Sequence, residues 1–287
     1  MKRKSNNFKS GLAITAICLV SLSACKKEKA EVFSDNDTSS SIENAVVEAA
    51  YNDVANIADQ AYSGIISTYR ASGDEGALSA CATVSFDTLS TAKIFTVDFG
   101  TVNCLGGDGN YRRGKIIIAF TGAYRDSGSS HSITFDGYYV NDNNIGGTKT
   151  VTNLGRNVAG YLTYSVSING TITWDSQTFA GGGTSTYTAN RTREWIVGEY
   201  TSNNWFDDVY LISGTSSGTT RTGSSYTANT VSPLKKYINF RYITDGTLAF
   251  TPSGKYTRYI NFGYSNGAKD NLAQVTIAGY TFVVQLK

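Results

Sequence analysis

The chain is poor in histidine, proline and charged side chains. Its 287 residues include 1 His and 2 Pro, and 17% of them are charged. With His131 alone and no Cys-x-x-Cys pair, the sequence offers no ligand set for a structural metal. A Ser–His–Asp triad would have to use the same histidine, and no Gly-x-Ser-x-Gly motif accompanies it. No basic stripe runs along any predicted element, so nucleic-acid binding is not expected.

The N-terminus has the three-part layout of a secretory signal. A basic start precedes an apolar run from Leu12 to Leu22, which is too short to cross a bilayer as a stable helix. The adjoining Leu22-Ser23-Ala24-Cys25 resembles the lipobox of bacterial lipoproteins. This resemblance implies that residues 1–24 are a signal peptide and that Cys25 is acylated and becomes the first residue of the mature chain.

Removal of residues 1–24 changes the charge of the chain. The formal charge is +2, with 25 basic and 23 acidic residues, and the leader holds four of the basic residues and no acidic one. The remaining 263 residues therefore carry 21 basic and 23 acidic side chains, a net charge of −2. That length suffices for one large all-β domain or two small ones, without a metal to hold the core.

Two of the four cysteines are left for a disulfide. Cys18 lies in the leader and Cys25 is the predicted lipidation site, so Cys81 and Cys104 remain. An even pair of cysteines in an oxidising compartment favours a disulfide between them. A metal-binding or catalytic thiol is the alternative interpretation.

Residues 25–40, which begin with the lipidated Cys25, are predicted to be a flexible tether because they are polar and almost without large apolar side chains. An amphipathic helix is predicted over residues 41–70, with Ser41 as its cap. Its apolar residues recur every three or four positions and form one stripe, expected to pack on a sheet, while the polar residues are expected to fill the other side. The stripe is Ile42, Val46, Ala50, Val54, Ile57, Ala61 and Ile65, and the polar side is Glu43, Glu48, Asn52, Asp53, Asn56 and Asp59.

Residues 78–287 are predicted to form an antiparallel β domain. The hydrophobic period is two from Ala82 onward, and no helix-length gap separates the strands, which excludes parallel βαβ connections. The fold class is therefore mainly β: an antiparallel meander, or a two-layer sheet or sandwich, with one N-terminal amphipathic helix packed on it. The predicted strands are 82–88, 93–99, 115–124, 132–140, 147–154, 161–168, 171–176, 185–196, 209–214, 224–230, 237–243, 247–251, 256–262, 273–277 and 280–286.

Two hairpins have a predicted register that places apolar side chains on one face. A three-residue loop is preferred at Asn169-Gly170 and a two-residue loop at Ala278-Gly279. The first pairs Val166 with Ile172 and Tyr164 with Trp174, and the second pairs Val275 with Phe282 and Ile277 with Tyr280. The segment 114–124 is apolar on both faces and is predicted to be a central strand covered on both sides, whereas 161–168 is predicted to have one wet face.

Several segments resemble a family of Bacteroidetes lipoproteins to which no activity is assigned. The resemblance spans most of the mature chain and implies an envelope location and a β-rich domain. Members of this family often carry a cysteine where this chain has Lys269, which implies one disulfide fewer here and leaves the Cys81–Cys104 bridge. The segments are Phe95–Gly100, Asn103-Cys104, Asp108-Gly109, Arg112–Ile116, Tyr139–Asn141, Gly147–Asn153, Arg191–Arg193 and Asp270–Gly279. Lys26, the residue after the lipobox cysteine, is not an aspartate and favours the outer membrane, on either its periplasmic face or the cell surface.

Few residues are candidates for ligand binding. Arg112 and Arg113 lie near Asp108 and are interpreted either as ion pairs that fix the Cys104 loop or as a patch for an anionic glycan. Trp195 and Trp205 are candidate stacking platforms for sugars. The carboxylates beside them are Glu194, Glu199, Asp207 and Asp208, which fit either a glycosidase pair or solvated strand ends. His131 is interpreted as an exposed turn residue.

These observations predict a lipid-anchored cell-envelope protein that is a non-catalytic binding or structural module, with no catalytic residue, metal or cofactor assigned. Its predicted partners are the membrane, through the lipid, and a glycan or an envelope protein. The alternative is a secreted hydrolase that acts on polysaccharide or peptide. A binder is expected to expose an aromatic patch or an edge strand, whereas a hydrolase is expected to bring two carboxylates, or His131 and a hydroxyl, together in a cleft.

Overall fold

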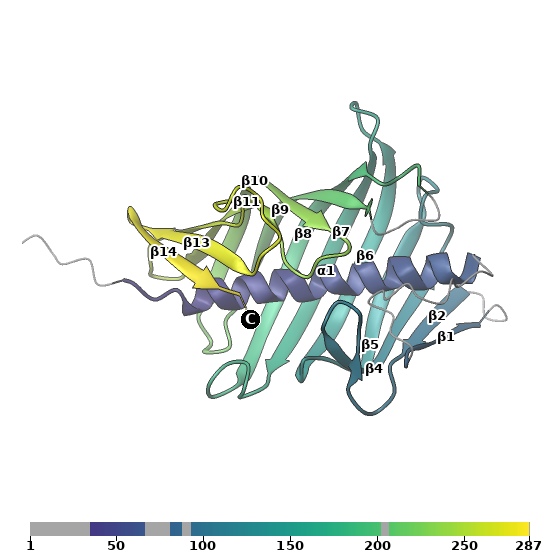
Figure 1. Cartoon of the computed structure of the whole chain (residues 1–287), viewed down its shortest axis with the longest axis horizontal. Helices are drawn as coiled ribbons and strands as arrows, with labels where there is room; N and C mark the ends of the chain where they lie inside the picture. The colour runs from purple at the N-terminus through teal and green to yellow at the C-terminus, as the bar shows by residue number, and fades with distance from the viewer. Residues whose placement is uncertain (1–34, 67–80, 88–92, 202–206, 287) are drawn as a thin grey trace, which may run out of the picture. The chain divides into compact units, whose positions relative to one another are not determined.

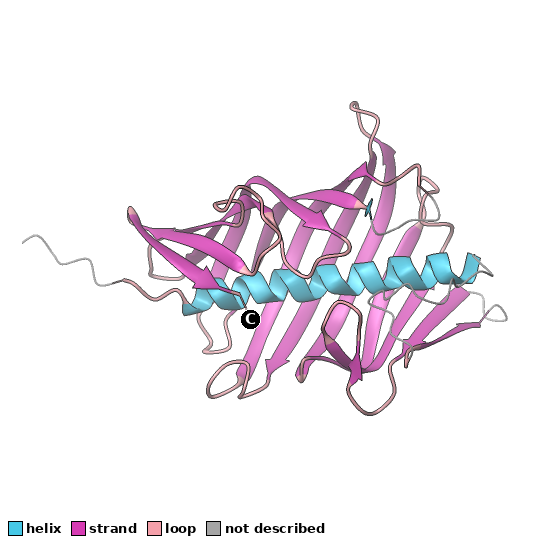
Figure 2. Cartoon of the chain, viewed as in Figure 1, coloured by secondary structure: helices cyan, strands magenta, loops and turns pink. Residues whose placement is uncertain are grey.

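A long helix lies across one face of an antiparallel sheet (Figures 1 and 2). The computed structural model describes residues 35–66, 81–87, 93–201 and 207–286. These residues belong to one unit that begins at Asp35. The predicted signal peptide, Cys25, most of the predicted tether and Trp205 lie outside the described residues.

Among the described residues, all fourteen strands belong to a single sheet, in the order β1-β2-β4-β5-β6-β7-β8-β9-β10-β11-β12-β13-β14, with β3 paired to β4. Strands that are consecutive in the sequence are neighbours in space, so the predicted antiparallel meander is confirmed and the sheet is one layer rather than a sandwich. The strands are β1 (Thr83–Asp87), β2 (Lys93–Asp98), β3 (Cys104–Leu105), β4 (Tyr111–Phe120), β5 (Ser130–Val140), β6 (Asn143–Arg156), β7 (Leu162–Trp174), β8 (Gly183–Val197), β9 (Val209–Thr219), β10 (Ser225–Tyr237), β11 (Asp245–Pro252), β12 (Arg258–Asn261), β13 (Leu272–Ile277) and β14 (Tyr280–Gln285).

The strand β7 shows why these sequences form strands with one buried face. Between Tyr164 and Trp174 its residues alternate between buried and exposed without interruption. Tyr164, Val166 and Ile172 point to the helix side and are buried. Ser and Thr side chains on the other face are exposed, so the predicted wet face is confirmed.

The predicted hairpin at Asn169-Gly170 is wrong, because β7 continues through both residues and pairs with β6 and β8 along its whole length. Gly170 instead marks the place where the helix comes closest to the sheet. A Cβ atom on Gly170 would lie 2.0 Å from the hydroxyl oxygen of Tyr51. That hydroxyl donates to the backbone oxygens of Gly146 (2.9 Å) and Thr171 (3.1 Å). A glycine inside a strand therefore signals close approach here rather than a turn.

The predicted hairpin at Ala278-Gly279 is confirmed, with Val275 opposite Phe282 and Ile277 opposite Tyr280. Both turn residues have positive φ, 47° at Ala278 and 89° at Gly279, as a type I′ turn requires.

Two other strand predictions need correction. β4 is buried on the helix face, but Ile117 and Ala119 on its outer face are half-exposed, so it is not covered on both sides. The strand predicted over 237–243 is wrong apart from Tyr237, because residues 238–244 form an irregular connection between β10 and β11. Pro233 lies within β10, where two register shifts toward β11 accommodate a residue that cannot donate to the ladder.

The helix α1 (Ser39–Ile66) begins two residues before the predicted cap. Asp37 Oδ1 accepts hydrogen bonds from the Ser39 backbone N–H (2.9 Å) and hydroxyl (2.6 Å), whereas Ser41 is buried inside the first turn. Asp35 forms an ion pair of 2.7 Å with Arg258, whose side chain is fully buried. The last residues of the predicted tether are therefore part of the folded unit.

The polar side of α1 is buried as well as its apolar residues. Glu43, Glu48, Asp53 and Asn56 are at most 7% exposed, as are apolar helix residues such as Val54. A buried carboxylate must find a hydrogen-bonding or charged partner, because desolvation of an unpaired charge is too unfavourable. The partners of these carboxylates come from the sheet, so the space between helix and sheet is polar as well as apolar.

Candidate functional site

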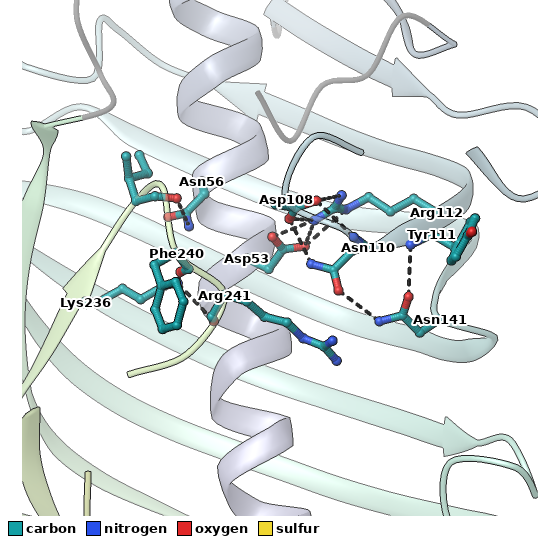
Figure 3. A network of polar contacts seen from close by, with 11 residues as sticks. Asp53, Asn56, Asp108, Asn110, Tyr111, Arg112, Asn141, Lys236, Phe240 and Arg241 are labelled. Atoms are coloured by element: carbon teal, nitrogen blue, oxygen red, sulfur yellow. Dashed lines mark hydrogen bonds and ion pairs between the residues drawn. The ribbon is translucent and has the colours of Figure 1, made fainter. Parts of the chain in front are cut away.

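The centre of the interior is an ion cluster in which one arginine holds two carboxylates (Figure 3). Arg112 on β4 is fully buried, and its Nη2 lies 2.8 Å from both carboxylate oxygens of Asp53 on α1. The same guanidinium contacts Asp108, with distances of 2.8 Å from Nη1 and 2.5 Å from Nη2. The predicted ion pair of Arg112 and Asp108 is confirmed, and Asp53 is the member that the prediction missed.

Burial and neighbouring charges shift the pKa values of this cluster in different directions. Burial raises the pKa of the Asp53 carboxyl, and the Asp108 charge acts in the same direction, against the opposing effect of Arg112. Burial is the largest influence on Asp108 and acts to raise its pKa, but hydrogen bonds and the positive charge of Arg112 lower that pKa below its ordinary value. Burial acts to lower the pKa of Arg112, and the Asp53 and Asp108 carboxylates more than compensate, so the guanidinium stays charged. Two carboxylates that share a guanidinium in this way do not form the open acid–base pair that hydrolysis of a glycoside needs.

A chain of amides extends from the cluster to the β5–β6 turn. Asn110 Nδ2 donates to Asp108 Oδ2 (2.8 Å), and Asn141 Nδ2 donates to Asn110 Oδ1 (2.9 Å). Asn141 Oδ1 accepts the backbone N–H of Tyr111 at 2.9 Å. Asn141 and Asp142 have φ of 47° and 65°, the conformation of a two-residue type I′ hairpin. The turn geometry thus fixes the Asn141 side chain beside the cluster, as Figure 3 shows.

On the other side of α1, the connection 238–244, here called the strap, passes close to the helix (Figure 3). Asn56 Nδ2 donates to the backbone oxygen of Ile238 at 3.2 Å. Lys236 at the end of β10 is 2% exposed and donates to the backbone oxygens of Phe240 and of Arg241, the latter at 3.0 Å. Burial lowers the pKa of Lys236 to about 8, against the opposing effect of the Asp53 and Asp108 charges.

A small cavity of about 30 Å³ lies between the helix, the Asn141 turn and the strap. Ala49 and Ala50 of α1 line it, and Arg241 of the strap lines it too. Its other lining residues are the polar Asp53, Asn110, Asn141 and Asn143 and the apolar or aromatic Val46, Val140, Ile145, Ile172 and Trp174. The volume corresponds to about two water molecules or one small polar group.

A second set of buried ionic contacts lies nearer the N-terminus of α1. Glu48 forms an ion pair with Arg191 on β8, and each side chain is 3% exposed. Arg191 also donates to the Gly214 backbone oxygen (2.7 Å) and to Ser216 Oγ (3.1 Å). The ammonium of Lys149 on β6 donates to the Tyr51 backbone oxygen at 2.6 Å. These contacts join helix and sheet, and together with the Arg112 cluster they form a polar seam through the core.

The residues predicted to bind a ligand are not gathered in one place. Arg112 is engaged in the cluster, whereas the neighbouring Arg113 is a quarter exposed, forms an ion pair with Asp142 and stacks on Tyr139 with 3.9 Å from Cζ to the ring centroid. Trp195 is 5% exposed and its Nε1 donates to Asp208 Oδ1 at 3.2 Å, so it presents no open ring face for stacking.

The other residues that the sequence suggested as candidates are engaged in contacts within the fold. His131 is buried within β5, with Nε2 3.3 Å from the Gly122 backbone oxygen, so its interpretation as an exposed turn residue is wrong. Glu199, which was expected at a solvated strand end, is 7% exposed and contacts Arg156 at 3.0 Å. The predicted disulfide between Cys81 and Cys104 is present, with Cα atoms 6.1 Å apart.

The seam residues carry a signal in the sequence. Residues 35–66 include six acidic residues and no lysine or arginine. Within the strands, Lys149, Arg191 and Lys236 occupy positions on the buried side of the alternation. A basic residue at a strand position where the alternation calls for an apolar one is expected to be buried and to need a counter-ion. The helix is acidic and has no basic residue of its own, so these two features together indicate buried ion pairs between helix and sheet.

Comparison of the chain with protein families, with curated proteins and with solved structures gave no match. Within the described residues, no helix has the length and apolar character needed to cross a membrane. The same part of the chain contains no group of three or more His, Cys, Asp or Glu side chains placed to hold a metal ion.

Proposed function

We propose that the chain is a lipid-anchored protein of the cell envelope, held at the outer membrane through Cys25. We propose further that its β domain is a non-catalytic module that binds a glycan or an envelope protein. The proposed lipid anchor is supported by the N-terminal sequence, in which a basic start and an apolar run lead into Leu22-Ser23-Ala24-Cys25. The folded unit begins at Asp35, ten residues after Cys25.

The pairing of the buried carboxylates with arginines supports the proposal that the module is non-catalytic. In the polar seam, Asp53 and Asp108 contact Arg112, and Glu48 contacts Arg191. These carboxylates hold the helix on the sheet. A hydrolase needs instead two carboxyl groups that face a substrate and a water in an accessible cleft.

The anchoring is tested by labelling cells that express the full chain with an alkyne analogue of palmitate. We expect the label on the wild-type protein and none on the Cys25→Ser variant, with the mature mass lacking residues 1–24. Cys104→Ser is the matched cysteine control and is expected to keep the label. An unmodified thiol at Cys25 in a protein that stays in the cytosol would contradict the proposal.

The hydrolase alternative is tested with the same acylated protein in detergent. Incubation with soluble polysaccharides and peptides is expected to release no new reducing ends or amino termini, whereas a glycan array is expected to show retention of specific structures. Turnover that survives purification to homogeneity would favour the hydrolase.

A further inference from the structure

The last strand of the sheet, β14, has an edge that no other described strand covers. The strand order ends at β14, which pairs with β13 alone (Figure 1). An edge strand presents backbone N–H and C=O groups to which another strand can add, and natural proteins block this with a lysine, a proline or a β-bulge. The sequence of β14 is Tyr-Thr-Phe-Val-Val-Gln, without a charged residue or a proline, and its register with β13 has no shift. This edge is therefore suited to pairing with a further strand.

Every second residue of β14 directs its backbone groups toward the open edge. Ile277 and Tyr280 flank the two-residue turn and form a hydrogen-bonded pair, and such pairs alternate along an antiparallel ladder. The Leu286 N–H donates to the Asn271 backbone oxygen at 2.7 Å, which continues the same alternation. The even-numbered residues of β14 thus bond to β13. The N–H and C=O groups that point away from β13 are those of Thr281, Val283 and Gln285.

The side chains at this edge leave apolar surface where a further strand would lie. Val283, on the outer face of the sheet, is 58% exposed. Phe282 lies on the helix side, opposite the buried Val275, and is nevertheless half-exposed. A strand added to β14 would cover both Phe282 and Val283 from the side. The burial of this apolar surface would add to the free energy of the backbone hydrogen bonds.

The strand β14 is complementary to itself. An antiparallel second copy, related by a two-fold axis at Val283, places Val283 opposite Val283 of the second copy and Thr281 opposite its Gln285. These are hydrogen-bonded pairs, so every outward N–H and C=O group finds a partner. On the helix side, Phe282 lies opposite Val284 of the second copy, and no charged side chain of β14 enters the contact.

We infer that β14 is the interface of a two-fold symmetric dimer, in which the sheets of two copies of this chain join edge to edge. The contact closes on itself, because each copy uses the same strand and presents no second β14. The inference goes beyond the proposed function and depends only on the fold.

The test is disulfide cross-linking of the full chain in the cells that express it, with copper phenanthroline as the oxidant and non-reducing gels as the readout. The Cα atoms of a hydrogen-bonded pair are about 5.5 Å apart, within the range of a disulfide. We expect Val283→Cys to form a dimer of the chain. Thr281→Cys and Gln285→Cys are each expected to stay monomeric when expressed alone, because the two identical cysteines would lie about 13 Å apart along the strands. Co-expression of these two variants is expected to give the cross-linked dimer.

Val231 provides the matched control, because its side chain is also 58% exposed but lies on β10, which has a neighbouring strand on each side. Val231→Cys is expected to give no dimer. Dimer formation by Val283→Cys no greater than by Val231→Cys overturns the inference. Equal dimer formation by Thr281→Cys alone overturns it as well, since the two-fold register keeps those cysteines apart. Cross-linking of Val283→Cys to another protein only would assign the edge to a different partner and also overturns the inference.

A second measurement needs no engineered bond. Val283→Lys places two like charges opposite each other at the axis and is expected to raise the dissociation constant of the dimer by roughly tenfold. Val231→Lys is expected to change that constant by less than about twofold, because it adds the same charge away from the edge. Sedimentation equilibrium of the full chain in detergent measures both constants, and equal values in the two variants overturn the inference.

Discussion

Glu48 and Arg191 form a fully buried ion pair that joins the only helix among the described residues to the middle of the sheet. Removal of one partner leaves a charge in the core without its counter-ion. We expect Arg191→Met to lower the free energy of unfolding by about 3–5 kcal/mol. In the double variant Glu48→Gln/Arg191→Met, the loss is expected to be smaller than in Arg191→Met alone, because no unpaired charge remains. Chemical denaturation of the wild type, Glu48→Gln, Arg191→Met and the double variant measures the coupling.

The matched control for this cycle is an exposed ion pair. Lys115 and Asp98 lie 3.2 Å apart, with side chains 44% and 35% exposed. Lys115→Met is expected to change the free energy of unfolding by less than about 1 kcal/mol, since water already solvates both groups. A loss in Arg191→Met no larger than that of Lys115→Met would show that the buried pair is not important for stability.

The second prediction concerns Gly170 and Tyr51: the effect of Gly170→Ala on the free energy of unfolding is expected to reverse its sign when Tyr51 is removed. In the wild-type protein, Gly170→Ala would place a Cβ against the Tyr51 ring and hydroxyl, and we expect a loss of about 1–3 kcal/mol. In a Tyr51→Ala background the three atoms nearest to this Cβ are absent, and alanine is favoured over glycine in a strand by roughly 0.5–1 kcal/mol. Gly170→Ala is therefore expected to stabilise the Tyr51→Ala protein. The midpoints of urea unfolding for the four proteins check this, and a loss in both backgrounds would contradict it.

The architecture could be predicted from the sequence because its signals are local. Alternation of period two is visible within one strand, and the Ala278-Gly279 turn sets the register of the hairpin around it. The burial of the polar side of α1 could not be predicted in this way. Asp53 and Arg112 are 59 positions apart in the sequence, and Glu48 and Arg191 are 143 positions apart. The periodicity of the helix is a local pattern, so it does not show which distant arginine neutralises each helix carboxylate.

The failure at Asn169-Gly170 has the same origin. Asn-Gly is a strong hairpin signal when the flanking strands pair with each other. Here both halves of β7 pair with β6 and β8 instead, and the space left by the missing side chain of Gly170 is filled by Tyr51 from a distant part of the chain. For the candidate site, the sequence indicated Arg112 and Asp108, but not Asn141 or Arg241, which reach the cavity only through the fold.

The Cys81–Cys104 disulfide is expected to stabilise the fold mainly through the unfolded state. The two cysteines are 23 positions apart, and a loop of that size corresponds to about 3 kcal/mol by chain entropy. We expect Cys81→Ser/Cys104→Ser to lose about this amount, and reduction of the wild-type protein to lower its stability to the same level. Denaturation with and without dithiothreitol measures both. An unchanged midpoint on reduction would contradict the prediction.

Lys236 gives a prediction for the dependence of stability on pH. Its pKa is about 8 in the folded protein, against an ordinary value of 10.5. Between these values the unfolded chain binds more protons than the folded one, so the contribution of Lys236 makes the protein more stable as the pH rises. From pH 7.5 to 9.5 this contribution amounts to about 2 kcal/mol. The charged groups that act on Lys236 are Asp53 and Asp108, which raise its pKa, and Arg193 and Arg241, which lower it.

The variant Lys236→Met isolates this effect. Its free energy of unfolding is expected to lack the rise of about 2 kcal/mol, so the difference between wild type and variant should increase by that amount between pH 7.5 and 9.5. Buried tyrosines such as Tyr51 have raised pKa values and lower the stability at high pH, but they do so equally in both proteins and cancel in the difference. Lys115→Met, at an exposed position, is expected to behave like the wild type. A difference that stays constant with pH would mean that Lys236 titrates in the folded protein as it does in the unfolded chain, and that the strap is not held by a buried ammonium.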